Sequence, residues 1–429
     1  MSRIRIIITI IVVVLTTLLT GCTGKEPNEI AYVVALGIDS TDDDNYKITI
    51  QYANTTQISG GTSESGGKAG SEIVDNVTIE APNIYAGVGL ANNIVSKSFS
   101  MSHAKLIVFS KEMAEKGVKD MIETLVRSEE IRPDVFIAVA NTTANDYLTS
   151  VNPEMEVNPA QYYQLIYQKN QLVGIPDGQL REFFTGLYTD NYDSILPVAG
   201  VIEGAGGNSQ NDDKGQSKDG QNEGSEGSSE SLDSFESKNS DENEKEKDAE
   251  KNTSKYEYDI KNYVGGETAI EKKNKAEAIG AAVFEKDKMV GELGEVETEI
   301  CKMLKGDYTY SYLTYYNNDT PDIPITVKTT QQKKPKYKID TDKKTVDIEL
   351  YIESDLYSLP ADYNVENKIE DFERNVANYT SSTCTKFINN FTKKYNSDIL
   401  KLNEKVKYKF LTNNQYLQHD PIRDRFLRS

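Results

Sequence analysis

Hydrophobic and polar positions along the chain follow the two-residue period of strands and the three-to-four-residue period of helices. The run from Ile30 to Asp39 is almost wholly apolar and predicts a buried strand. The next predicted strand alternates apolar and polar positions and places Tyr46, Ile48, Ile50 and Tyr52 on one side. The polar cluster Asp42-Asp43-Asp44-Asn45 between them predicts a hairpin loop.

The rest of the N-terminal half mixes both periods. Apolar residues spaced by three or four predict helices over Ile84–Val95, Pro159–Val173 and Gln179–Tyr188. Ser110 can cap a further helix, which has the apolar face Val118, Met121, Ile122 and Leu125. The short runs Lys105–Phe109 and Val135–Ala140 predict strands.

The C-terminal half is predicted to be rich in strands. Strands are expected over 278–284 and 289–293, joined by a turn at Lys286 and Asp287, and over 308–316, 323–329 and 344–352. A helix over 295–304 separates the two groups. A long amphipathic helix then carries an apolar stripe expected to pack on the preceding sheet: Ile369, Phe372, Val376, Tyr379, Thr383, Phe387, Phe391 and Tyr395. The pattern predicts an α+β, multidomain fold, with mixed β-sheets packed with helices and a long amphipathic C-terminal helix.

A change in composition divides the 429-residue chain. Residues 204–255 are almost exclusively Gly, Ser, Asn, Asp, Glu and Lys, and residues 203–255 hold 15 acidic and 7 basic side chains, a net charge of −8. Such a segment buries too little apolar surface to offset its chain entropy. We therefore expect an acidic disordered linker at 204–262, between an N-terminal region at 22–203, with two subdomains as an open alternative, and a C-terminal domain at 263–429. A smaller flexible loop is expected at Ser59–Ser71.

The start of the chain predicts a signal peptide over residues 1–21. Arg3 and Arg5 precede the apolar run Ile6–Leu19, which is short for a membrane-spanning helix of about 20 apolar residues. The end of this run and the residues after it, Leu19-Thr20-Gly21-Cys22, resemble a bacterial lipobox. That resemblance implies cleavage before Cys22 and lipidation of its thiol, with palmitate among the attached acyl chains. An ordinary signal peptide with a chance cysteine is the alternative.

Net charge and cysteine content limit which partners, membrane attachments and disulfides are expected. The formal charge of −20 repels phosphate backbones, so no nucleic-acid partner is expected. It also disfavours docking on anionic lipid, which leaves Cys22 as the membrane attachment. The other two cysteines, Cys301 and Cys384, lie in apolar helical patterns, and free buried thiols are favoured over one disulfide.

No residue pattern indicates catalytic, cofactor or metal chemistry. The two histidines, His103 and His419, lack partners at metal-ligand spacing, and a structural role at a strand start is favoured for His103. The segment Asp39–Asn45 lacks the glycine and distal glutamate of an EF-hand loop and is interpreted as a solvated hairpin tip. Gly87-x-Gly89 is too short for a dinucleotide fingerprint and indicates close helix packing.

Five sequence blocks, in order, resemble the Ger(x)C lipoproteins, the C subunits of nutrient germinant receptors in spore-forming bacteria. The most extended is the block from Ala278 through Phe284, Gly291 and Leu293 to Glu297. The others are Ala35-Leu-Gly37-Ile-Asp39, Ser102–Ser110 with the positions following it (Ala114–Gly117 and Arg127–Arg132), Leu180–Phe184 and Ile195–Pro197.

The resemblance implies a non-enzymatic, lipid-anchored subunit that acts in receptor assembly and germination signalling. Its implied location is the outer face of the spore inner membrane, and its implied partners are the integral-membrane A and B subunits. The linker is longer than the family leads us to expect. A further strand is also expected after the long helix, which makes the domain at 263–429 truncated and leaves its sheet without an edge strand.

Two other function classes remain open on the sequence. A solute-binding lipoprotein feeding a membrane transporter would need two α/β lobes around a ligand cleft, and the unlike halves of the chain argue against it. A surface hydrolase is disfavoured by the two isolated histidines.

Overall fold

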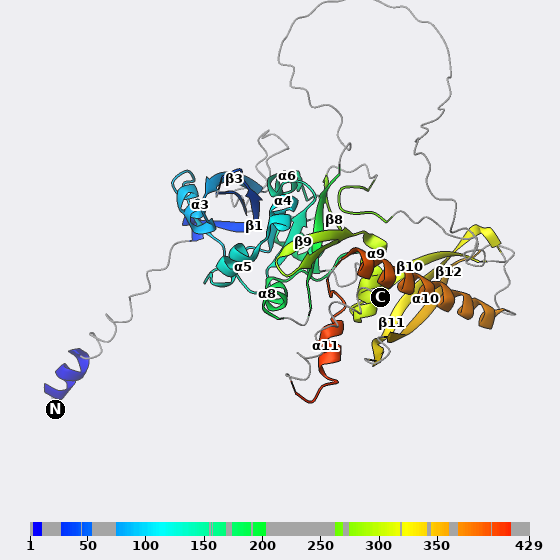
Figure 1. Cartoon of the computed structure of the whole chain (residues 1–429). Helices are drawn as coiled ribbons and strands as arrows, with labels where there is room; N and C mark the ends of the chain where they lie inside the picture. Colours follow the sequence, from blue (N-terminus) through cyan, green and yellow to red (C-terminus); the bar gives the residue numbers. More distant parts are fainter. Residues whose placement is uncertain are drawn as a thin grey trace, which may run out of the picture.

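The structure is a computed structural model of the whole chain (Figure 1). It describes residues 3–10, 27–43, 45–53, 74–153, 156, 158–168, 174–189, 192–202, 262–268, 274–317, 320–340, 345–359, 368–395 and 397–412. Cys22, the Ser59–Ser71 loop, most of the linker and His419 lie outside these residues. No helix among the described residues is long and apolar enough to cross a membrane.

A nine-stranded mixed sheet forms the larger part of the molecule. Its order is β3-β2-β1-β5-β6-β7-β8-β9, with β4 pairing beside β1. Strands β1, β5, β6 and β7 run parallel, and the outer strands add antiparallel hairpins. The strands are β1 Ile30–Ser40, β2 Tyr46–Ala53, β3 Val74–Ala81, β4 Ser98–Ser100, β5 Leu106–Ser110, β6 Phe136–Ala140, β7 Ile195–Val201, β8 Ala276–Glu285 and β9 Lys288–Leu293.

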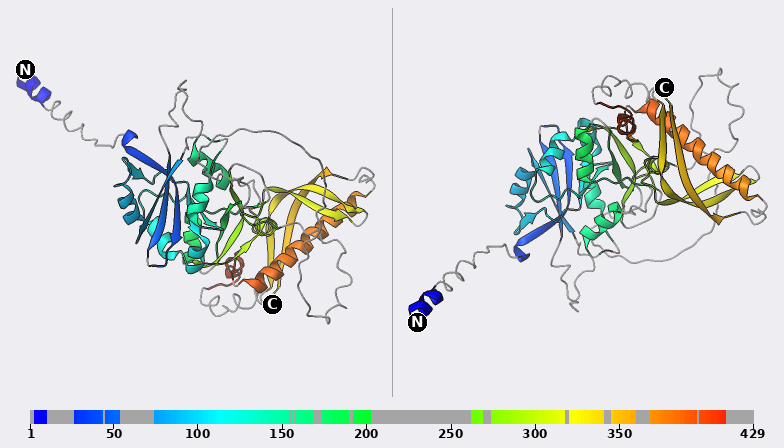
Figure 2. Two further views of the ribbon diagram at one scale, coloured as in Figure 1. Left: turned by 90° about the horizontal axis from the view of Figure 1, so that it is seen from above. Right: turned by 90° about the horizontal axis from the view of Figure 1, so that it is seen from below.

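Helices cover both faces of this sheet (Figure 2). Successive side chains of a strand point to opposite faces, so Ile107 and Phe109 enter one core while Leu106 and Val108 enter the other. The first core is covered by α3 Ile84–Ala91, α4 Lys111–Lys116, α5 Lys119–Val126 and α8 Leu180–Tyr188. The second is covered by α6 Ala144–Ser150 and α7 Pro159–Gln168.

The helix predicted after Ser110 is in fact two helices. Ser110 Oγ accepts a hydrogen bond from Met113 N at 3.3 Å and caps α4 as expected. Gly117 then ends α4 with a φ of 125°, a conformation that glycine adopts at little cost. The predicted apolar face belongs entirely to the second helix, because Val118 is the N-cap of α5 and Met121, Ile122 and Leu125 lie on it.

The linker interrupts a single sheet rather than joining two. Strand β8, which follows the linker, pairs antiparallel with β7, which precedes it, and Ile195 lies opposite Val283. The segment 262–268 also packs against β7, so closely that a Cβ on Gly200 would collide with Gly265 and Gly266. The expected boundary near residue 262 therefore does not separate the two sheets of the molecule.

A second, antiparallel sheet follows, in the order β10-β11-β12. Its strands are β10 Tyr310–Asn317, β11 Thr320–Asp340 and β12 Thr345–Ser358, and its helices are α9 Glu295–Lys305, α10 Ile369–Lys394 and α11 Leu402–Lys407. Among the described residues β12 pairs with β11 alone, and a groove of about 980 Å³ separates it from α10. The further strand expected after α10 stays a prediction.

The long helix α10 joins the two sheets. Phe372 and Val376 pack on β11, as predicted from the stripe. Phe387 and Phe391 instead pack with α9 and with β8 and β9. The first half of the stripe thus packs on the preceding sheet as predicted, and the second half also packs against α9 and the main sheet. Cys301 on α9 and Cys384 on α10 are both buried and free, which confirms the free thiols, and burial raises the pKa of each to about 11.

Candidate functional sites

The carboxyl ends of β1, β5 and β6 meet at one edge of the main sheet, where open α/β sheets commonly bind ligands. A hollow of about 420 Å³ lies there. Its wall comes from the strand ends and from α4 and α6, and it holds four carboxylates and one lysine, which are Asp39, Glu112, Glu115, Asp146 and Lys111.

Asp39, at the end of β1, is buried rather than solvated. Its Oδ1 accepts a hydrogen bond from Ala144 N at 2.6 Å, and its Oδ2 accepts one from Asn145 N at 3.2 Å. Both donors lie in the first turn of α6, where backbone N–H groups have no partner within the helix. The interpretation of Asp39 as part of a solvated hairpin tip is therefore wrong, although Asp42 and Asp43 are exposed as expected.

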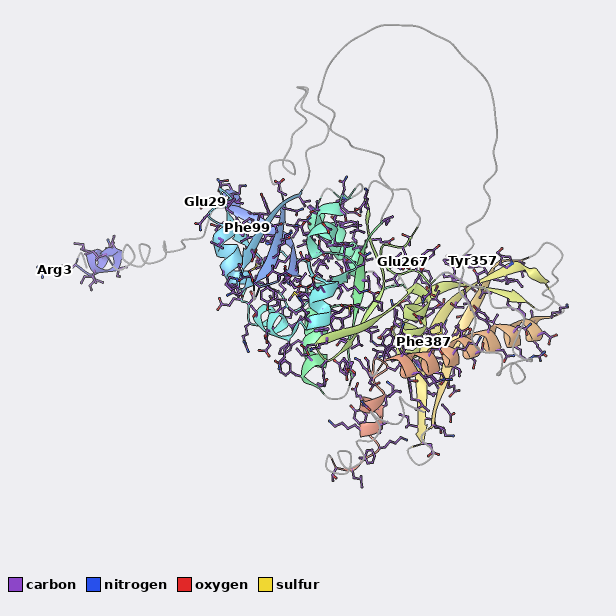
Figure 3. The ribbon with its side chains drawn as sticks, turned by 45° about the horizontal axis from the view of Figure 1, so that its top comes forward. Arg3, Glu29, Phe99, Glu267, Tyr357 and Phe387 are labelled. Carbon is purple, nitrogen blue, oxygen red and sulfur yellow. The ribbon has the colours of Figure 1, made fainter. Side chains whose placement is uncertain are left out.

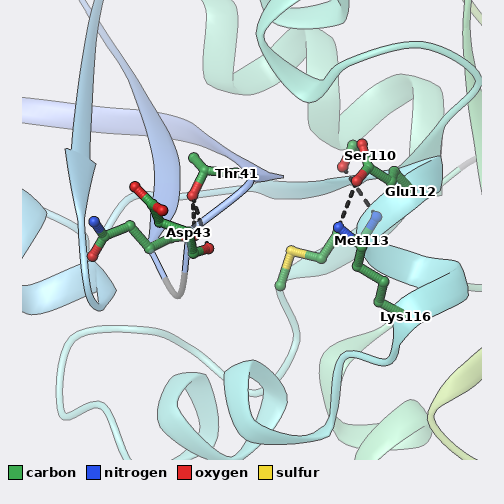
Figure 4. Close-up of polar contacts among 7 residues, drawn as sticks. Thr41, Asp43, Ser110, Glu112, Met113 and Lys116 are labelled. Carbon is green, nitrogen blue, oxygen red and sulfur yellow. Dashed lines mark hydrogen bonds and ion pairs between the residues drawn. The ribbon is translucent and has the colours of Figure 1, made fainter.

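The hairpin tip closes on itself, and the neighbouring charges are paired (Figure 4). Thr41 Oγ1 donates to the carbonyl oxygens of Asp43 and Asn45, at 3.1 and 2.8 Å. Lys116 pairs with Glu112 one turn earlier in α4. Lys111 pairs with Glu292 of β9 at 3.0 Å. The polar groups at this edge thus cap helices and tie α4 to β9.

His103 lies in the turn before β5 and contacts neighbouring hydroxyl and aromatic groups. Its Nδ1 is 3.0 Å from Ser102 Oγ, which in turn is 2.9 Å from Ser100 Oγ. Its ring packs edge-on against Tyr32 with the centroids 4.8 Å apart. A catalytic pair also needs a third group that orients the base, and no carboxylate hydrogen-bonds His103 among the described residues. These contacts support the structural role favoured from the sequence.

A pocket of about 310 Å³ lies between α9, β10, β11 and α10. Glu299 of α9 lines it and accepts a hydrogen bond from Ser311 Oγ at 2.8 Å. Burial raises the pKa of Glu299 to about 7, and Glu295 one turn earlier adds to the rise. The pocket therefore changes charge near neutral pH. Sequence reasoning missed it because residues 295–384 meet only in the folded chain, and no motif marks them.

Comparison with known proteins shows the family of the chain. Residues 24–201 match the spore germination protein N-terminal domain family, and residues 279–421 match the spore germination B3/GerAC-like C-terminal family. The chain belongs to the Ger(x)C family of spore germination proteins. The two matches confirm the predicted resemblance to this family in the N-terminal and the C-terminal part of the chain. The predicted α+β fold class is also confirmed.

Individual relatives match shorter parts. Spore germination protein KC of Bacillus subtilis (strain 168) is 26% identical over 38% of this chain and 43% of its own length. The putative spore germination protein YfkR of the same organism is 30% identical over 34% of this chain and 37% of its own. The chain thus spans about two fifths of these relatives. The crystal structure of the GerBC protein aligns over 91% of both chains, at 13% identity and a TM-score of 0.46.

The residues that carry the Ger(x)C resemblance occupy close-packing positions. A Cβ on Gly37 would lie 3.0 Å from Leu148 Cδ1 and 3.1 Å from Ala144 Cβ, so Gly37 lets α6 approach β1. A Cβ on Gly291 would collide with the ring of Tyr395. Glu297 Oε2 accepts a hydrogen bond from Gly294 N at 3.2 Å and caps the start of α9. These blocks therefore specify how helices dock on the main sheet.

Proposed function

We propose that this chain is a lipid-anchored, non-enzymatic subunit of a spore nutrient germinant receptor, acting in receptor assembly and in signalling of germination. The observation that carries the proposal is the pair of family matches, which cover residues 24–201 and 279–421. Relatives named as spore germination proteins agree with it.

In this proposal Cys22 is the lipid acceptor and holds the protein on the outer face of the spore inner membrane. The chain works by contact with the integral-membrane A and B receptor subunits. The carboxyl edge of the main sheet supports this mode of action, because there Asp39 caps α6 and Lys111 ties α4 to β9. The blocks shared with the family likewise serve packing.

A solute-binding lipoprotein is the less favoured alternative. Such a protein encloses its ligand between two α/β lobes. Here the two parts differ in kind, one a mixed sheet covered on both faces and the other a three-stranded antiparallel sheet.

The experiment is deletion of the gene in a spore-forming strain from which other germinant receptors have been removed. We expect loss of the nutrient response, retention of germination by receptor-independent routes, and lower levels of the A and B subunits, because a bound subunit stabilises its partners. Restoring the wild-type chain should restore the nutrient response and the levels of the A and B subunits, whereas Cys22→Ala should not. A normal nutrient response in the deleted strain would contradict the proposal.

A further inference from the structure

One segment of this acidic protein carries no charge and exposes several large apolar side chains. Residues 81–96 contain no Asp, Glu, Lys or Arg, although 27% of the chain is charged. They form α3 and the turn after it, in which three large side chains are exposed: Tyr85 by 47%, Leu90 by 50% and Ile94 by 68%. We call these three residues the α3 patch. Large apolar side chains exposed together on a segment without charge indicate an interaction site.

The packing of α3 fixes which side faces outward. A Cβ on Gly87 would lie 2.8 Å from Ile48 Cδ1, so this side of the helix lies tightly against β2. A Cβ on Gly89 would meet no atom within 4 Å. The residues of the α3 patch therefore lie on the solvent side of the helix, and other apolar residues of α3 pack in the core.

The α3 patch lies at the end of the molecule where β1 begins. Strand β4 follows the turn that holds Ile94, and its Ser98 pairs with Ile30, the first residue of β1. Asn92 Oδ1 accepts a hydrogen bond from Phe99 N at 2.8 Å and holds this turn against β4. Figure 3 shows Glu29 and Phe99 at the same end of the molecule, opposite Tyr357.

A short tether connects this end to Cys22. The 3-10 helix η1, Pro27–Glu29, leads directly into β1. Pro27 lies five residues after Cys22, and an extended chain spans at most about 3.6 Å per residue, or about 18 Å over these five steps. A lipid on Cys22 therefore keeps Pro27, the first residue of η1, within about 18 Å of the bilayer surface, and β1 begins directly after η1.

We infer that the α3 patch rests on the phospholipid bilayer and inserts Tyr85, Leu90 and Ile94 among the headgroups. The inference rests on the lipidation of Cys22 proposed above. Aliphatic side chains gain free energy on leaving water, and tyrosine favours the membrane interface. The patch carries no charge that would have to be desolvated or that anionic lipid would repel. Because the tether supplies a high local concentration, a contact too weak to recruit a free protein suffices.

This contact sets the orientation of the whole molecule. Figure 1 shows α3 and the three-stranded sheet at opposite ends. With α3 on the membrane, β10, β11, β12 and α10 lie on the far side of the main sheet from the lipid. The C-terminal half is thereby presented away from the bilayer.

The test places an environment-sensitive fluorophore at each end of the full-length, lipidated protein. The test variant is Ile94→Cys. The control is Tyr357→Cys at the opposite end, where the native Tyr357 is 57% exposed. Each is labelled with NBD under native conditions, where Cys301 and Cys384 are buried, and the unsubstituted chain measures background labelling. The proteins are reconstituted on vesicles of phosphatidylcholine and phosphatidylglycerol, with and without lipids carrying a doxyl quencher.

We expect a blue-shifted emission that increases at least twofold on vesicles at position 94, with quenching by doxyl lipid, and no change at position 357. A lipidated, vesicle-bound protein whose label at 94 stays in water would overturn this inference and leave the anchoring intact. Absence of lipid on Cys22, detected by mass spectrometry, would overturn the inference together with the proposed anchoring.

Discussion

Asp39 offers a sharp test of how the main sheet is built. It is 5% exposed at the end of β1, and both of its carboxylate oxygens accept backbone hydrogen bonds from the first turn of α6. Asp39→Ala removes both acceptors and leaves Ala144 N and Asn145 N without the partners they have in the native protein.

The expected loss follows from two opposing effects. A hydrogen bond to a charged group contributes about 1.5–3 kcal/mol, and a buried donor left unpaired costs about 1–3 kcal/mol. Burial, however, raises the pKa of Asp39, so its ionised form already carries a desolvation cost that alanine removes. We therefore expect Asp39→Ala to lower the free energy of unfolding by about 2–3 kcal/mol, a large share of the usual 5–15 kcal/mol. Asp39→Asn, which keeps one acceptor oxygen, should lose about half as much.

The assay is urea unfolding followed by far-ultraviolet circular dichroism and by tyrosine fluorescence, since the chain has 26 tyrosines and no tryptophan. Asp43→Ala is the matched control, because Asp43 lies on the same hairpin and is exposed. It should change the stability by less than about 0.5 kcal/mol. Equal stabilities of Asp39→Ala and Asp43→Ala would refute the capping role of Asp39.

Two further predictions concern the C-terminal half. Phe387→Ala should destabilise the protein by about 3–5 kcal/mol, because the Phe387 ring is only 5% exposed and fills the core between α10 and α9. Asn390→Ala is the control, since Asn390 is exposed on the same helix. Equal unfolding curves of the two variants would place the Phe387 face of the helix in solvent. Burial raises the folded-state pKa of Glu299 above its ordinary 4.5 to about 7. Its stabilising contribution is thus fully present below pH 4.5 and is lost as pH rises through 7, by up to about 3 kcal/mol. Glu299→Gln should flatten this part of the stability–pH curve, whereas the control Glu370→Gln, at an exposed position, should leave it unchanged. An unchanged slope in Glu299→Gln would contradict the burial of the Glu299 carboxyl.

Elements with a strong, uninterrupted period could be predicted from the sequence, and weaker ones could not. The apolar run of β1 and the stripe of α10 gave correct elements with nearly correct ends. β7 was missed because Pro197 and Gly200 argue against a strand with neighbours on both sides. The structure accommodates Pro197 at a register shift in the pairing with β8. The seven-residue α6 is too short to show a period.

The candidate sites depended more heavily on tertiary structure. Asp39 belongs to an acidic run in the sequence, and only the position of α6 shows that it is buried and bonded. Glu299 is one of many carboxylates in an acidic chain, and the walls of its pocket come from four separate elements. Local patterns identify such residues as polar but do not show which ones the fold will enclose.

Because the linker interrupts one sheet, cutting it should leave the two halves of the protein bound to each other. Strands β7 and β8 pair across the linker from Ile195 to Val201. Ser397 Oγ donates to Phe284 O at 2.8 Å, and Asp398 N donates to Asp193 Oδ2 at 2.9 Å, so the segment after α10 holds residues on both sides of the linker. A site for a specific protease inserted within residues 204–255 allows the cut to be made after folding. We expect the cleaved chain to elute from gel filtration as one complex, with the uncut chain as the reference for size, and to separate only in denaturing urea. The fragments should stay together because separating them would break the hydrogen bonds and core contacts that they share, without new partners to compensate. Two separate fragments in native buffer would instead show that the halves fold as independent units.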